Sequence, residues 1–157
     1  MKTVKQLVSV AVISLISAFS VNAQTSTTPT KDDLHKKLTL HHTTATEHAN
    51  KIKSGATKTT AEHKTAAIEA GKHLNEAKAA HKQLKASIPA NKKAAAQVHH
   101  DAIDKHHTAA EMHHKELTAE LSKTAPDAAK VKSHATGLHT SLTSAEKEHQ
   151  ALKEATK

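Results

Sequence analysis

Apolar residues and histidines recur at alternating spacings of three and four residues through four long segments of the chain. This period keeps the recurring side chains on one face of an α-helix, so it predicts four amphipathic helices. We expect these helices at about residues 30–53, 59–87, 92–122 and 124–157. The recurring positions are Leu34, Leu38, His41, Ala45, His48 and Ile52; His63, Ala67, Ala70, Leu74, Ala77, His81, Leu84 and Ile88; Ala96, His99, Ile103, His106, Ala110, His113 and Leu117; and Ala128, Val131, Ala135, Leu138, Leu142, Ala145, His149 and Leu152.

Capping and turn residues separate these segments. Glycine and proline are rare, with three of each, and we expect most of them to mark boundaries, as at residues 54–56 and 88–91. A threonine followed three residues later by an acidic residue predicts a helix start. The pairs are Thr30 with Asp33, Thr59 with Glu62, and Thr124 with Asp127.

The two halves of this pattern resemble each other. Residues 38–52 match residues 103–117, and residues 74–86 match residues 142–154, with histidines aligned on histidines. The match indicates a duplicated αα-hairpin. Because short loops make successive helices antiparallel neighbours, we predict an all-α, up-down-up-down four-helix bundle.

The first residues follow a different pattern. Lys2 and Lys5 precede an apolar run at 7–21, and Val21-Asn22-Ala23 places small residues where a signal peptidase cleaves. The run is shorter than the roughly 20 residues that span a bilayer, so we expect no stable membrane anchor after cleavage. The sequence thus predicts a signal peptide at 1–23, a flexible leader at 24–29 and a helical bundle domain at 30–157, in the periplasm or secreted.

Composition limits the chemistry that this domain can perform. The chain has no cysteine, which excludes disulfides, thiolate metal sites and a cysteine nucleophile. Large aliphatic residues are few and the net charge is +8, a combination that also fits a disordered chain. The abundant alanine, lysine and glutamate favour helix instead.

The 16 histidines are the most informative feature of the composition. When the chain is folded about turns near residues 56, 90 and 124, they fall into three levels, each with a histidine from every helix. The levels are His48, His63, His113, His114 and His134; His41, His42, His73, His106, His107 and His139; and His35, His81, His99, His100 and His149. Eight of these histidines lie on the predicted core stripes, including His99, His106 and His113, and the others flank the stripes.

Histidines at these levels predict transition-metal binding, and all 16 are candidate ligands. Neutral imidazole suits Zn, Cu, Ni and Co. No two histidines stand three or four residues apart, so an ion must be held between helices. Binding would then be coupled to packing of the helices. Asp104, Glu111 and Glu146 lie three or four residues from a histidine, and we expect them to orient the ligands by hydrogen bonds from behind.

Two other functions use the same histidines. Facing histidines could hold a haem iron from both sides, with small alanines leaving room for the macrocycle, although large apolar pocket walls are lacking. Alternatively, buried histidines could make a pH-responsive or buffering protein without a defined metal site, because protonation below about pH 6 would charge the core.

Other functional classes have little support in the sequence. We expect no enzyme, because nucleophile and phosphate-loop motifs are missing. We expect no nucleic-acid partner, because the chain has no arginine and no aromatic stacking residues beyond Phe19. The expected partners are metal ions, and the chain is expected to be a monomer or a homodimer.

Overall fold

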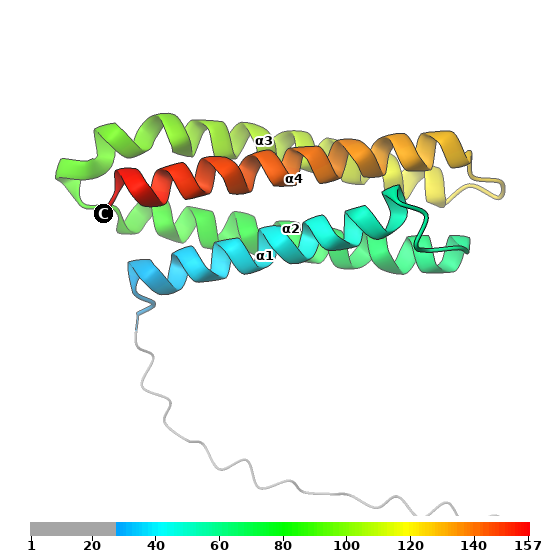
Figure 1. Cartoon of the computed structure of the whole chain (residues 1–157), viewed down its shortest axis with the longest axis horizontal. Coiled ribbons are helices and arrows are strands. Elements are labelled where there is room, and N and C mark those ends of the chain that lie inside the picture. Colours follow the sequence, from blue (N-terminus) through cyan, green and yellow to red (C-terminus); the bar gives the residue numbers. More distant parts are fainter. Residues whose placement is uncertain (1–27) are drawn as a thin grey trace, which may run out of the picture.

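Four long helices run side by side in the computed structural model, which describes residues 28–157 (Figure 1). They are α1 (Lys31–Lys53), α2 (Thr60–Ser87), α3 (Lys93–Leu121) and α4 (Ala128–Ala155), and a short 3-10 turn, η1 (Ala90–Lys92), precedes α3. The start of α1 and the end of α4 lie at the same end of the bundle as the α2–α3 connection. The predicted all-α, up-down-up-down bundle is confirmed. The predicted signal peptide and leader residues 24–27 lie outside the described residues.

Local capping explains where three of the helices begin. Thr30 and Thr59 both form the predicted capping boxes, in which the threonine hydroxyl accepts from a backbone N–H and the acid three residues on accepts in return. At the start of α4 the predicted capping residue, Thr124, is not the N-cap. Asp127 caps this helix by accepting from the N–H groups of Ala129 and Lys130, because an acid at this position reaches the first free donors directly.

The α1–α2 turn requires a glycine. Gly55 has a φ of +72°, in the left-handed region that side chains with a Cβ adopt only under strain. The N–H of Gly55 donates to the carbonyl of Ile52, which closes the end of α1. This turn therefore fixes the antiparallel return of α2 along α1.

The helices close into a ring in which α1 packs on α2 and α4, and α3 packs on α4 and α2. Alanine and leucine fill the core in two apolar clusters. One cluster includes Leu74, Leu117 and Leu138, and the other includes Leu38 and Leu84. The many buried alanines let the helix backbones approach closely, which brings histidines on facing helices within reach of each other.

None of the described helices is long and apolar enough to span a bilayer.

Candidate metal centre

All 16 histidines lie within the described residues, and none of them is fully exposed. Seven are buried and nine are half-buried. The buried ones are His35, His41, His42, His81, His100, His107 and His149. The half-buried ones are His48, His63, His73, His99, His106, His113, His114, His134 and His139.

The predicted choice of core histidines was wrong at several positions. On α3 the structure buries His100 and His107, whereas His99 and His106 are only half-buried. Each member of a doubled pair lies three or four residues from Ile103, so the heptad pattern alone cannot distinguish them. Leu121 is the residue that distinguishes the two members of each pair. It continues the series of His100 and His107 at seven-residue spacing, and this large apolar side chain is buried.

The same kind of error occurs on α1 and, at one position, on α2. On α1 the structure buries His35 and His42 in addition to His41, while His48 is half-buried and the adjacent Ala49 takes the core position. On α2, His63 is half-buried near the α1–α2 turn. On α1 the core face is rotated slightly from the predicted stripe, whereas on α2 every other residue of the predicted stripe is buried.

Four groups of two histidines and one carboxylate have ligand atoms close enough to hold a metal ion, within 4.8 Å of one another. We name each group after its carboxylate. They are the Glu76 site (His41, His73, Glu76), the Glu146 site (His42, Glu146, His149), the Asp104 site (His81, Asp104, His107) and the Glu116 site (His113, Glu116, His134). In every group the two histidines come from different helices, as predicted for interhelical binding.

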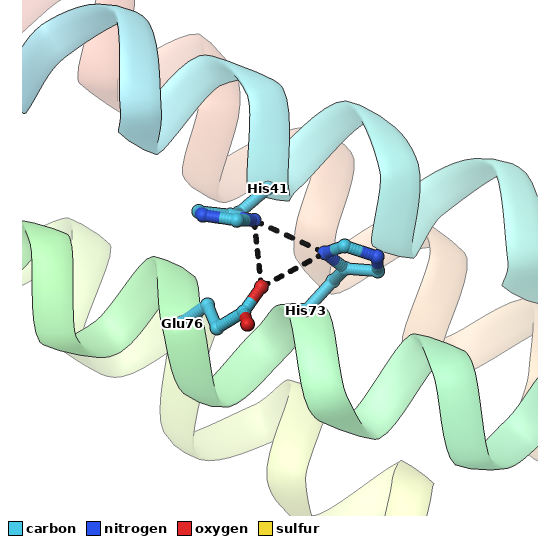
Figure 2. Close-up of side chains that lie close together, drawn as sticks. All are labelled: His41, His73 and Glu76. Carbon is cyan, nitrogen blue, oxygen red and sulfur yellow. Dashed lines mark hydrogen bonds and ion pairs between the residues drawn. The ribbon is translucent and has the colours of Figure 1, made fainter. Parts of the chain in front are cut away.

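The Glu76 site joins α1 to α2 (Figure 2). His41 Nδ1 lies 3.0 Å from His73 Nδ1, and the two nitrogens lie 3.0 and 3.1 Å from Glu76 Oε2. Figure 2 shows the three side chains converging between the two helices, with the carboxylate below both rings. Three potential ligand atoms thus form a compact triangle near the bundle surface.

The Glu146 site lies in the interior. His42 Nδ1 donates to Glu146 Oε2 at 2.8 Å, and His149 Nδ1 reaches the same oxygen at 3.2 Å. Thr39 and Gln150 donate to the other oxygen, Oε1. Burial raises the pKa of Glu146, but the hydrogen bonds from the two histidines and Gln150 outweigh it and hold this pKa well below its ordinary value. A permanently charged carboxylate therefore lies beside two buried imidazoles.

The Asp104 site has the same composition but opens toward solvent. His81 Nδ1 lies 3.1 Å from Asp104 Oδ1, and the rings of His81 and His107 lie 5.6 Å apart. All three residues line a surface pocket together with lysines of α2. This pocket gives an ion from solvent access to the two buried imidazoles.

Six buried histidines connect these two sites in a continuous chain across the bundle. In order they are His35, His149, His42, His107, His81 and His100, which we call the histidine chain. Three of its links are nitrogen–nitrogen contacts of 2.8 Å, from His35 to His149, from His42 to His107 and from His81 to His100. Among the described residues, no hydrogen-bond partner reaches the Nε2 atoms of His35 and His100 at the two ends.

The predicted levels are only partly confirmed. The contacts of His35 with His149, His42 with His107, and His41 with His73 each join histidines of one level. The Glu146 and Asp104 sites, however, each combine histidines of two adjacent levels. The reason is that a histidine side chain reaches along the helix axis as well as across it, so levels separated by about 10 Å still interact.

The carboxylates are the part of the site that the sequence interpretation missed. Glu76 and Glu116 were not recognised, and Asp104 and Glu146 were expected only behind the ligands. A histidine and an acid three residues apart lie on one helix face, as in 73–76 and 113–116, and this spacing could have identified them. Glu111, the third predicted partner, forms an ion pair with Lys78 instead.

Eight histidines lie outside the four groups, and their surroundings differ. They are His35, His48, His63, His99, His100, His106, His114 and His139. His99 pairs with Glu148 at 3.0 Å, and Lys53 Nζ donates to His139 at 3.4 Å. His35 and His100 contact ligand histidines, and the ring of His48 stacks on His73 at 6.3 Å.

Two glycines inside helices make room for the doubled histidines at the end of α3. A Cβ on Gly137 of α4 would lie 2.6 Å from the ring of His113, and one on Gly71 of α2 would come still closer to the ring of His114. His114 also donates to the carbonyl of Ala67 at 2.9 Å. The doubled pair therefore packs on two different neighbouring helices, one ring on each glycine.

Replacing Gly137 by alanine should impair the Glu116 site without unfolding the bundle. Alanine favours helix by about 1 kcal/mol over glycine, but the new methyl group must displace the His113 ring. We expect at least tenfold weaker zinc binding at this site and unchanged helicity. Calorimetry and circular dichroism measure the two quantities, and Gly71→Ala is the matched control, because it displaces the ring of His114, which belongs to none of the four groups. Unchanged zinc binding by Gly137→Ala would argue against His113 as a ligand.

Burial keeps several of the interior histidines neutral, which is the form that binds metal. It lowers the pKa of His35 and of His81 to about 4, with repulsion from neighbouring cations adding to the effect on His35. The pKa of His107 is lowered still further by burial and by the adjacent His42. Metal binding at these residues therefore does not compete with protons at neutral pH.

The geometry of the sites fits a four-coordinate ion. Histidine nitrogens bind zinc at about 2.0–2.1 Å, which places two of them about 3.3 Å apart on a tetrahedral ion. The potential ligand atoms of the Glu76 site are 3.0–3.1 Å apart, so an ion needs an opening of only a few tenths of an ångström. Two imidazoles and one carboxylate leave at least one position for water or a fourth ligand.

No known protein family, curated protein or solved structure matches the chain.

Proposed function

We propose that this protein is exported and binds transition-metal ions, such as Zn, Cu, Ni or Co, to buffer or sequester them in the periplasm or outside the cell, without a catalytic role. The observation that carries the proposal is the pair of interior sites. There, four buried imidazoles from four different helices lie against Glu146 and Asp104. Buried polar groups are expensive unless they have partners or a function, and four such groups together favour a ligand.

The distribution of the sites supports buffering rather than a single structural ion. A closed structural site would draw all of its ligands around one ion, whereas here four small sites are spread along the bundle. The Asp104 site opens into a surface pocket, and Glu146 lines another. Ions could therefore enter and leave without global unfolding.

Interhelical ligands also predict that metal stabilises the fold. An ion that binds only the folded chain adds about 2.7 kcal/mol of stability at a free concentration one hundred times its Kd. Alanine buries little apolar surface per residue, so the alanine-rich core contributes little hydrophobic stabilisation per residue. Bound metal can therefore add substantially to the stability of the fold.

His107→Ala should remove one zinc ion, whereas His106→Ala should not. The two residues are adjacent on α3, but His107 is a buried member of the Asp104 site and His106 belongs to none of the four groups. We expect calorimetry of the apo-protein with zinc to give a lower stoichiometry and a smaller rise in melting temperature for His107→Ala. Equal binding by wild type and both variants, or no binding tighter than about micromolar by the wild type, would contradict the proposal.

The pH-responsive function is a second candidate, and the lowered pKa values of the buried histidines favour it. The two functions differ in their response to added metal, since a pH-responsive protein without sites would change with pH alone.

Haem binding stays a prediction. A haem iron held by His42 and His107 would have to separate two ring nitrogens that are now 2.8 Å apart. Adding haemin to the apo-protein tests it, because ligation by two histidines produces a low-spin Soret band.

A further inference from the structure

The Glu146 and Asp104 sites touch each other through one ligand from each. His42 Nε2 lies 2.8 Å from His107 Nε2, and both rings are almost completely buried. These two histidines are 65 residues apart, so they occupy the same position in the two matching hairpins. The outer contacts of the histidine chain repeat in the same way, atom for atom and at the same distance of 2.8 Å, as His35 Nδ1 with His149 Nε2 and His100 Nδ1 with His81 Nε2. The two sites are matching halves of one centre.

The contact between the halves needs one N–H and one lone pair. Two neutral imidazoles form a hydrogen bond only when one ring nitrogen donates and the other accepts. Glu146 assigns the roles in the metal-free protein, because His42 donates to it through Nδ1 and therefore has a lone pair on Nε2. His107 must then donate through its own Nε2.

A metal ion changes what each ring presents at this contact. When His42 binds an ion through Nδ1, its proton moves to Nε2, and His107 must accept. When His107 binds through Nδ1, its own Nε2 carries a proton and donates. A ring that binds through Nε2 has no lone pair left to accept a hydrogen bond.

With an ion in each site, the His42–His107 hydrogen bond therefore cannot form. Either two N–H groups face each other at 2.8 Å, or an ion occupies the nitrogen that should accept. A single ion bound through Nδ1 meets no such conflict, because the ring of the empty site can carry its proton on whichever nitrogen completes the hydrogen bond.

We propose that the two central sites are negatively coupled, so that an ion in one weakens the binding of a second ion in the other. The coupling rests on the proposed function, since it requires both sites to bind ions. Loss of one hydrogen bond between buried groups should weaken the second step at least about tenfold. The protein would then hold one ion firmly and exchange the other at higher metal concentrations, which widens its buffering range.

Each central site can be measured alone and then compared with the pair. His73→Ala and His134→Ala first remove the Glu76 and Glu116 sites, giving a background protein with only the central sites. In this background, His81→Leu isolates the Glu146 site and His149→Leu isolates the Asp104 site. Neither substitution alters the His42–His107 contact itself, and leucine fills most of the volume of the histidine ring. Zinc binding is measured by calorimetry at neutral pH.

Negative coupling predicts that, in the background protein, the second ion binds at least about tenfold more weakly than the weaker of the two isolated sites. If the curve instead equals the sum of the two isolated curves, the sites bind metal independently and the coupling is wrong. Absence of zinc binding in every protein would overturn the proposed function itself. An ion that remains after His81→Leu and His149→Leu are combined, and is lost when His107 is also replaced, would lie between His42 and His107, which contradicts the coupling.

A second pair of variants tests the coupling in case the replacement of a buried histidine by leucine disturbs the fold. Asp104→Asn and Glu146→Gln weaken the same two sites while preserving side-chain volume, and the amide introduced by Glu146→Gln would still offer an oxygen to His42 in place of the carboxylate contact. Circular dichroism verifies that each variant keeps its helicity. The same tenfold comparison then applies, and additive binding in this pair would overturn the coupling as well.

Discussion

The metal-free protein is expected to lose its fold steeply between about pH 6.5 and pH 4, with a midpoint near pH 5. His35, His81 and His107 are neutral in the folded state at neutral pH, and the pKa of His35 and of His81 is about 4, against an ordinary value of 6.5. The unfolded chain therefore takes up protons first as the pH falls. The stability that these histidines contribute is complete above pH 6.5 and is lost toward pH 4.

The size of the effect follows from the number of histidines that stay neutral. Stability changes by about 1.4 kcal/mol per pH unit for each proton that only the unfolded chain binds. His35, His81 and His107 together give about 4 kcal/mol per pH unit, and a typical domain has only about 5–15 kcal/mol in total. Urea unfolding at a series of pH values measures this slope.

Replacing His35 and His81 together by leucine should reduce that slope by about 3 kcal/mol per pH unit, since two titrating groups are removed. Saturating zinc should shift the acid midpoint to lower pH, because metal competes with protons for the same nitrogens. A fold that persists unchanged at pH 4 would contradict the burial of neutral histidines.

Glu146→Ala is expected to destabilise the metal-free protein by about 2–4 kcal/mol. The substitution leaves the N–H groups of His42 and His149 without their acceptor, and an unpaired buried donor costs about 1–3 kcal/mol. Thr39 loses a contact of 2.9 Å at the same time. Glu146→Gln should be less destabilising, since its amide oxygen can still accept.

Glu148→Ala provides a matched control two residues away on α4. Glu148 accepts from one half-buried histidine, His99, at 3.0 Å, so its loss should cost less than about 1 kcal/mol. Urea unfolding at pH 7 compares the three variants. If Glu146→Ala and Glu148→Ala have equal effects, the buried carboxylate does not organise the centre as the structure indicates.

The helices and their order could be predicted from the sequence because strong local signals specify them. The alternation of apolar residues and histidines identified each helix, and capping residues such as Thr30 and Thr59 fixed two of the starts. These signals depend on residues within one helical turn of each other. They do not depend on how the neighbouring helices pack, so the helices they predict are present in the folded bundle.

The rotation of each helix about its axis could not be predicted as well. His99 and His100 are equivalent relative to Ile103, and tertiary packing decides between them. Gly71 and Gly137 lie inside helices, as predicted, but their contacts with the rings of His114 and His113 could not be predicted. Such contacts join residues far apart in the sequence, and no local pattern specifies them.

The meeting of His42 with His107 has a consequence for symmetry. In a dimer of two identical hairpins, this histidine would face its own copy on the two-fold axis, and one of the copies would have to donate while the other accepted. Equal sequences would leave that choice undecided. In one chain the halves can differ, and they do: Glu146 of α4 corresponds to Lys78 of α2, and Asp104 of α3 to Thr39 of α1. Joining two similar hairpins thus allows the sequence to assign a direction to a hydrogen bond that a symmetric pair could not orient.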